Sequence, residues 1–127
     1  MNKQVISTPH APSAIGPYSQ AIRFGNLLFV SGQIPIDPST GNLIEDKTIQ
    51  GQTRRVLQNV IAIVEAAGAS SQNIVKTTVF LQNMSDFAEM NAVYSTFFPS
   101  MPPARATIEA ARLPRDVSIE IDCIAVI

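Results

Sequence analysis

Side chains able to bind a metal ion or to act as strong nucleophiles are scarce in this sequence. The chain of 127 residues holds one histidine, His10, and one cysteine, Cys123, whereas a structural zinc site needs about four such ligands. There is also no glycine-rich phosphate loop. We expect His10 in an exposed loop and Cys123 in the apolar core, and so predict a site with no metal and no cofactor.

Three segments combine polar side chains with glycine and proline in patterns more specific than a generic fold requires. Taken alone, Arg105 is a surface arginine that could pair with Glu109, and Glu120 is a solvated strand residue with Asp122 on the same face. Tyr18 follows Gly-Pro in a loop, where a packed tyrosine with a bonded hydroxyl and a contact to a ligand are equally good interpretations. The segments are 14–20 (Ala-Ile-Gly-Pro-Tyr-Ser-Gln), 31–35 (Ser-Gly-Gln-Ile-Pro) and 103–121, which contains Pro-Ala-Arg, Ala-Arg-Leu-Pro-Arg-Asp-Val and Ile-Glu-Ile.

The elements that must position these side chains follow from hydrophobic periodicity. Residues 20–24 and 27–34 predict a β-hairpin around Gly25-Asn26, because glycine tolerates the positive φ that tight hairpin turns need. Apolar residues at helical spacing predict a helix over about 48–67, and Gly68 is a natural end for it.

The second half of the chain predicts three further strands, with a second helix between the first and the second of them. The β-branched run 75–81 indicates a strand. A helix should open near Ser85 or Asp86 and end before Pro99, because both residues are good caps and proline disfavours helix in the residue before it. Its apolar stripe, which we expect to face the core, consists of Phe87, Met90, Tyr94, Phe97 and Phe98. Residues 104–113 lead through a turn at 113–116 into a last strand over 117–127.

The order β-β-α-β-α-β-β indicates an α+β fold, a single domain over residues 1–127 with a mainly antiparallel sheet and two helices on one face. The other face also carries apolar side chains, such as Ile124 and Val126 on the last strand. Self-association is the economical way to cover that face.

Spacing alone does not bring Arg105 and Glu120 together. A plain hairpin register between the last two strands pairs Arg105 with Ile124 and Glu120 with Glu109. A bulge, a different turn or a neighbouring subunit would be needed to unite the two side chains.

Charge and hydropathy exclude several classes of protein. The formal net charge is −1 and the 9 basic residues are scattered, which disfavours a nucleic-acid binder, because phosphate contacts dominate such binding. No apolar run approaches the roughly 20 residues that cross a bilayer, and the N-terminus lacks the apolar core of a secretory signal. We therefore expect a cytoplasmic protein with no membrane partner.

Together, the three segments resemble the RidA/YjgF family of reactive-intermediate, or enamine/imine, deaminases. The resemblance runs from about Thr8 to Val126, and several fixed spacings agree at once in 103–114. It implies a homotrimer of a chorismate-mutase-like α+β fold, with a site at each subunit cleft. The implied trimer agrees with the uncovered sheet face.

The resemblance also implies roles for individual residues. Arg105 matches the arginine that binds the substrate carboxylate, and Glu120 matches the acid that positions or activates water. Tyr18 and the turn Ser31-Gly32 match positions that line the cleft, and Asn91 matches a polar cleft residue on the second helix.

The chain departs from the family pattern just after the arginine. The family often has Ser-Cys there, and this chain has Ala106-Thr107. A thiol contact to the ligand is therefore lost, although backbone groups at Thr107 remain able to bind it. The resemblance therefore indicates the type of reaction better than it indicates which substrate is preferred.

The implied reaction is hydrolysis of 2-aminoacrylate or 2-iminobutanoate to a 2-oxo acid and ammonia. A guanidinium holds the substrate carboxylate at two points, and a carboxylate orients water and moves a proton. These imines hydrolyse in water, so positioning with acid–base assistance suffices. Two alternatives stay open: the endoribonuclease or translation-inhibitor activity described for relatives, and a non-catalytic binder or chaperone of small carboxylates.

Overall fold

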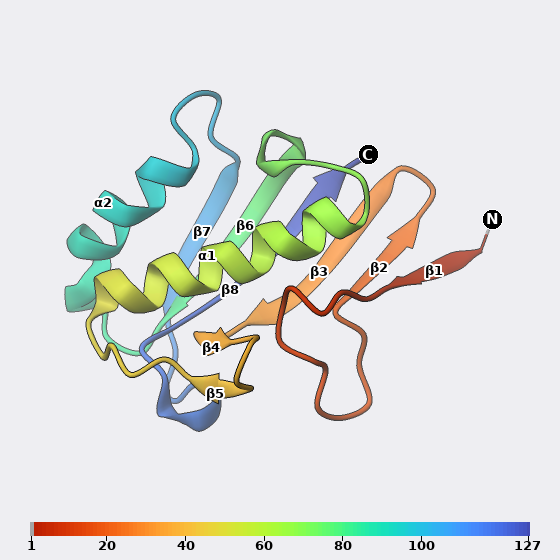
Figure 1. The fold of residues 1–127 in the computed structure, drawn as a ribbon. Coiled ribbons are helices and arrows are strands. Elements are labelled where there is room, and N and C mark those ends of the chain that lie inside the picture. Colours follow the sequence, from red (N-terminus) through yellow and green to blue (C-terminus); the bar gives the residue numbers. More distant parts are fainter. Residues whose placement is uncertain (1) are drawn as a thin grey trace.

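Six strands form one sheet, and two helices lie across one of its faces in the computed structural model, which describes residues 2–127 (Figure 1). Met1 of the predicted 1–127 domain lies outside the described residues. The strand order is β1-β2-β3-β8-β6-β7, and only the β6–β7 pair is parallel. This confirms the α+β class. The strands are β1 (Lys3–Ile6), β2 (Ala21–Phe24), β3 (Leu27–Gln33), β6 (Ile74–Leu81), β7 (Ala104–Glu109) and β8 (Ile119–Val126).

The helices begin and end close to where the sequence predicts. The Thr48 side chain caps α1 by accepting a hydrogen bond from the Gly51 N–H, and Gly68 follows the helix with a φ of 86°. Within residues 2–127 neither helix has the length and hydropathy of a membrane span. The helices are α1 (Ile49–Ala66) and α2 (Phe87–Phe97), and the short elements are β4 (Ile36–Asp37), β5 (Asn42–Leu43) and the 3-10 turns η1 (Ser71–Asn73), η2 (Met84–Asp86) and η3 (Pro114–Asp116).

The core lies between the helices and one face of the sheet. Alternate residues of β8, from Ile119 to Ala125, are buried and pack into one cluster with the apolar stripe of α1. Cys123 belongs to this buried row, and burial raises the pKa of its thiol to about 12. As predicted, the cysteine is a core residue, and it stays protonated.

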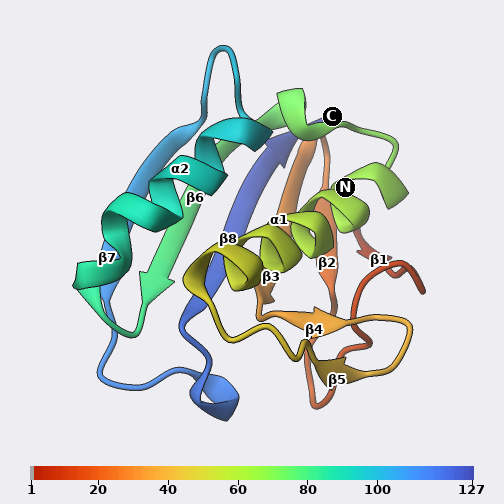
Figure 2. The same cartoon turned by 60° about the vertical axis from the view of Figure 1, so that its left-hand side comes forward.

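The opposite face of the sheet carries no helix among the described residues (Figure 2). Strand registers place several large, exposed apolar side chains on this open face, and the alternation of β8 places Glu120 there too. The exposed apolar side chains are those of Val5, Phe24, Leu27, Phe29 and Ile108. The sequence prediction of an apolar second face is confirmed.

The predicted hairpin register between the last two strands is wrong. β7 pairs in parallel with β6, so Arg105 lies opposite Thr77, and Glu120 lies opposite Phe80. β8 inserts between β3 and β6 and is antiparallel to both, which leaves the outer edge of β6 for β7. The chain reaches that edge through α2, as a parallel crossover requires.

Candidate functional site

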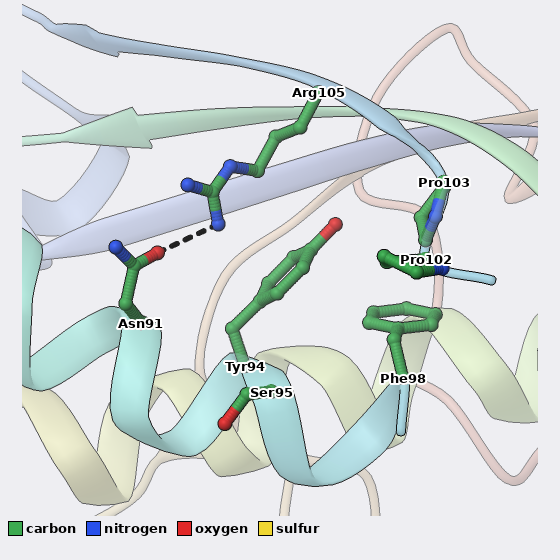
Figure 3. Close-up of a pocket in the computed structure, with 7 residues that line it drawn as sticks. All are labelled: Asn91, Tyr94, Ser95, Phe98, Pro102, Pro103 and Arg105. Carbon is green, nitrogen blue, oxygen red and sulfur yellow. Dashed lines mark hydrogen bonds between the residues drawn. The ribbon is translucent and has the colours of Figure 1, made fainter. Parts of the chain in front are cut away.

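Arg105 points from β7 toward Asn91 and Tyr94 on α2 (Figure 3), and the ring of Phe87 on the same helix lies near its guanidinium. Its Nη1 donates a hydrogen bond of 2.7 Å to Asn91 Oδ1. Its guanidinium carbon lies 4.8 Å from the centroid of the Tyr94 ring and 5.5 Å from that of Phe87. Positions 87, 91 and 94 recur at helical spacing and so face β7 together. The guanidinium is therefore fixed by one rigid helix.

No acidic side chain within residues 2–127 forms an ion pair with Arg105. The only ion pair found within residues 2–127 joins Arg112 to Asp116. Glu109, the alternative partner suggested by the sequence, instead accepts a hydrogen bond of 2.8 Å from the Met84 N–H, so that pairing is not formed. An unpaired, half-buried cation against aromatic rings is suited to bind an anion.

A cavity of about 470 Å³, here called the arginine cavity, opens beside this guanidinium. Nε and Nη2 of Arg105 have no hydrogen-bond partner found within residues 2–127, and these two groups form one edge of an arginine. That edge can grip a carboxylate at two points. The cavity is lined by Asn91, Tyr94, Ser95, Phe98, Pro102, Pro103 and Arg105.

Phe87 and Tyr94 are site residues that sequence reasoning assigned to the core. Tyr94 is buried, and its hydroxyl lies 2.7 Å from Thr77 Oγ1 on β6. Burial raises the pKa of Tyr94, so the hydroxyl stays protonated and anchors the ring. Phe87, in contrast, is 37% exposed, which corrects its assignment to the core. The signal was present in their spacing of four and three residues from Asn91.

Glu120 lies on the open face of the sheet, against the backbone of β3. A Cβ added at Gly32 would collide with Glu120 Oε2 and stand 2.9 Å from Cδ. Only a residue without a side chain leaves room for the carboxylate at this point. Gly32 therefore does more than bend a strand, because it fixes where Glu120 can sit.

The surroundings of Glu120 suit a proton acceptor. Burial raises the pKa of its carboxyl, and the neighbouring charge of Asp122 raises it further. A general base works best when its pKa approaches the working pH, because it then holds a proton readily once it has taken one. Perturbed carboxyl groups in a cleft are characteristic of functional sites.

A second cavity, here called the glutamate cavity, has a volume of about 480 Å³ in front of Glu120. Tyr18 forms part of its wall with a half-exposed ring, and its hydroxyl accepts a hydrogen bond of 3.4 Å from the Ile15 N–H. The Ser31 hydroxyl donates to the carbonyl of Ser19 at 2.6 Å, which ties this loop to β3. The cavity is lined by Ile15, Tyr18, Ser31, Gly32, Ile34, Pro114 and Glu120.

Gln20, the last residue of the segment 14–20, holds the loop that carries Tyr18, a role that the sequence did not predict. Its side chain is buried, and its Oε1 accepts a hydrogen bond of 2.7 Å from the Thr8 N–H. Its Nε2 donates to the carbonyls of Thr8, Ala11 and Pro12 at 3.1, 3.3 and 2.8 Å. A polar residue at the start of a hairpin gives no sequence signal of such long-range contacts.

The predicted site residues thus fall into two groups on opposite faces of the sheet. Asn91 and Thr107 share the helix-covered face with Arg105, and the Thr107 hydroxyl is buried with no hydrogen-bond partner found within residues 2–127. The other group surrounds Glu120 on the open face. Arg105 and Glu120 are not brought together within one protomer. The second group consists of Tyr18, Ser31, Gly32 and Glu120.

The chain is similar to known proteins along nearly its whole length. The family model described as Endoribonuclease L-PSP matches residues 8–127. A 2-iminobutanoate/2-iminopropanoate deaminase of Salmonella typhimurium is 52% identical over 126 residues, covering 97% of each chain. A RutC family protein of Pyrococcus horikoshii is 55% identical over 123 residues, again 97% of each chain. Among solved structures, Escherichia coli TdcF with bound serine has a TM-score of 0.92 and 47% identity, covering 98% of each chain. The chain therefore belongs to the Endoribonuclease L-PSP family, which is the RidA/YjgF family.

Proposed function

We propose that the protein is a deaminase of 2-imino acids such as 2-iminobutanoate, and that it works as a homotrimer of the chorismate-mutase-like kind. One observation carries the proposal: the chain presents an unpaired guanidinium and a carboxyl with a raised pKa, each in its own cavity. The names of relatives support it, since two proteins about half identical to this chain are called 2-iminobutanoate/2-iminopropanoate deaminases. The serine bound to TdcF is also a small carboxylate.

A complete site requires a second subunit. Arg105 faces the helices from β7 while Glu120 faces the open side from β8, and β6 lies between those two strands. One small molecule cannot touch both side chains across a sheet. A second copy that lays its open face against the edge at β7 would bring its Glu120 to the first copy's Arg105. Burial of the exposed apolar side chains on the open face would drive that association.

Substrate binding rests on Arg105. The substrate carboxylate occupies the Nε–Nη2 edge, while Asn91 holds Nη1 and the rings of Phe87 and Tyr94 fix the guanidinium plane. A planar two-point grip also sets the direction of the imine carbon next to the carboxylate. Thr107 lies on the same face, but its hydroxyl is buried and the residue does not line the arginine cavity.

Glu120 of the neighbouring subunit performs the proton transfers. Its carboxylate takes a proton from water as the water oxygen bonds to the imine carbon. The electron pair of the C=N bond moves to nitrogen, which receives that proton from Glu120. The hydroxyl of the resulting carbinolamine then gives its proton to Glu120, which passes it to the amino nitrogen as the C=O bond forms, the C–N bond breaks and ammonia leaves. The products are the 2-oxo acid and ammonia.

The two alternative functions predict different uses of these residues. An endoribonuclease, as the family description says, would need phosphate contacts, yet the net charge is −1 and the lone His10 is exposed. A carboxylate-binding protein would need Arg105 but not Glu120. Loss of turnover in Glu120→Gln with ligand binding retained therefore separates an enzyme from a binder.

Mixed assemblies test the proposal. Arg105→Ala and Glu120→Gln should each abolish acceleration of 2-iminobutanoate decay, measured above spontaneous hydrolysis with the imine generated in situ by a dehydratase. When the two variants are unfolded together and reassembled at equal amounts, about a quarter of the sites receive Arg105 from one subunit and Glu120 from another. Activity should return to about that fraction of the unmutated rate.

Each variant reassembled alone is the control and should stay inactive. No recovery on mixing, while the unmutated protein recovers fully after the same treatment, would show that the site is not shared between subunits. An Arg105→Ala protein as active as the unmutated one would refute the carboxylate clamp itself.

A further inference from the structure

The turn between β7 and β8 holds two residues in an unfavourable backbone conformation. Arg115 and Asp116 have φ angles of 56° and 58°, a region that costs a residue with a side chain roughly 1 kcal/mol or more. The turn is kept in shape by Arg112, whose Nε and Nη2 donate to the two Asp116 carboxylate oxygens at 2.7 and 3.1 Å. The Asp116 N–H also donates to the Leu113 carbonyl at 3.0 Å.

The consequence of this strained turn is the position of the Arg115 side chain. It lines a side cavity of about 230 Å³ that adjoins the glutamate cavity. The two cavities share Ile15, Tyr18, Gly32, Ile34 and Pro114 as walls. A molecule in front of Glu120 thus has a continuous route along apolar walls to Arg115.

The charge of Arg115 is available for a ligand. No hydrogen bond or ion pair of its side chain is found within residues 2–127, and the side chain is exposed. The neighbouring cation, Arg112, is neutralised by Asp116. A largely apolar passage that ends at a free guanidinium suits a short hydrocarbon chain with an anion at its end.

We propose that Arg115 binds a second carboxylate of the substrate, so that the site accepts dicarboxylic 2-imino acids. The imine of glutamate is the fitting example, because two methylene groups separate its second carboxylate from the imine carbon. The inference rests on the proposed function, since Arg105 of a neighbouring subunit holds the first carboxylate. Arg115 is a specificity residue in this scheme and takes no part in proton transfer.

Binding of the corresponding 2-oxo acids tests the inference without any catalysis. By calorimetry, 2-oxoglutarate should bind the unmutated protein about tenfold more tightly than 2-oxobutanoate, as expected for one charge-assisted hydrogen-bonded contact. Arg115→Gln should remove this preference and leave the dissociation constant of 2-oxobutanoate within about twofold. Arg115→Lys should retain part of it, because a point charge replaces the planar fork.

Arg54→Gln is the matched control, because it removes an exposed arginine on α1 that lines neither cavity, and it should leave the preference unchanged. Imines generated in situ by oxidases from alanine and glutamate then add a kinetic readout. Arg115→Gln should slow the decay of the glutamate imine alone.

The outcomes separate the inference from the proposed function. The inference is overturned if Arg115→Gln keeps the preference for 2-oxoglutarate, or if it weakens the binding of both oxo acids equally. It is also overturned if neither oxo acid binds the unmutated protein. If the preference depends on Arg115 but no imine decays faster, the second-carboxylate site stands and the deaminase proposal fails.

Discussion

The two halves of the candidate site are built by opposite means. Arg105 is surrounded by side chains of one helix: an amide at hydrogen-bond distance and two aromatic rings. Glu120 is placed by the missing side chain of Gly32 and is enclosed by a loop and a strained turn.

This difference indicates different tolerances to change. Several partners share the task of fixing Arg105, so loss of any one should weaken binding only in part. The position of Glu120 depends on a single empty space, so filling it should abolish the function of the carboxylate at once.

Filling the space at Gly32 should have the largest effect. In Gly32→Ala the new Cβ displaces the far end of the Glu120 side chain, which can swing away. We expect turnover of 2-iminobutanoate to fall about 100-fold, as for loss of a general base, while the free energy of unfolding changes by less than about 1 kcal/mol.

The double variant Gly32→Ala with Glu120→Gln is the control for this prediction. If the alanine acts through the carboxylate, the second change adds little to the first, whereas independent effects multiply. Multiplying effects in the imine-decay assay would mean that Gly32 acts in another way.

Removing the support of the Tyr18 loop should come next. Gln20→Met keeps the volume of the side chain but leaves the Thr8 N–H and the carbonyls of Ala11 and Pro12 without their partner. We expect a loss of about 2 kcal/mol in the free energy of unfolding, measured by denaturant at fixed protein concentration, with faster proteolysis in residues 8–18. Gln58→Met, at an exposed position of α1, is the matched control, and an equal loss there would contradict a special role for Gln20.

Loosening the guanidinium should have a smaller effect. Asn91→Ala removes one hydrogen bond of Arg105 and leaves both rings in place, so we expect the dissociation constant of 2-oxobutanoate to rise between threefold and tenfold, or about 1 kcal/mol. Ser95→Ala is the matched control. Ser95 lines the same cavity, but its hydroxyl donates to the Ala92 carbonyl and not to Arg105. Equal weakening by both variants in calorimetry would argue against the Asn91 contact.

The smallest effect concerns how the ionisation of Glu120 changes the free energy of unfolding with pH. Since its pKa is raised in the folded state by burial and by Asp122, the folded protein binds the proton more tightly than the unfolded chain. Stability therefore falls as pH rises through the interval between the unfolded and folded pKa, and the cost is full above it.

Glu120→Gln removes this cost. The variant should be more stable than the unmutated protein at neutral pH, and the difference should vanish below the unfolded pKa, as denaturant midpoints from pH 3 to 8 would reveal. An advantage that grows as pH falls would have the wrong sign. Asp122→Asn should show a similar trend with a smaller difference, since its charge is the lesser cause.

Local sequence patterns predicted most helices and strands of this fold, but they did not predict which strands pair over long sequence distances. The turn Gly25-Asn26 and the buried alternation of β8 each encode their own structure, and both were found where expected. The parallel pairing of β7 with β6 depends on which edge is left once β8 is in place, which no local pattern records. β1 was missed because Lys3–Ile6 is short and mostly exposed.

The candidate site divides in the same way. Residue motifs pointed to Arg105 and Glu120, yet only the structure places them on opposite faces of the sheet. Phe87 and Tyr94 resembled ordinary core aromatics, because an aromatic that supports a guanidinium has the same spacing as one that fills a core. Gln20 acts on carbonyls eight to twelve residues away, a relation set by loop geometry.

The central position of β8 has a consequence for how the chain is made. Ile119–Val126 fills the gap between β3 and β6, so until these residues leave the ribosome the earlier strands form two separate pieces with unpaired edges. Such edges are templates for intermolecular pairing, and long-range strand pairing is intrinsically slow. We therefore expect ribosome-stalled chains that end before residue 119 to be sensitive to protease and to need chaperone protection, which a short extension beyond residue 127 would relieve.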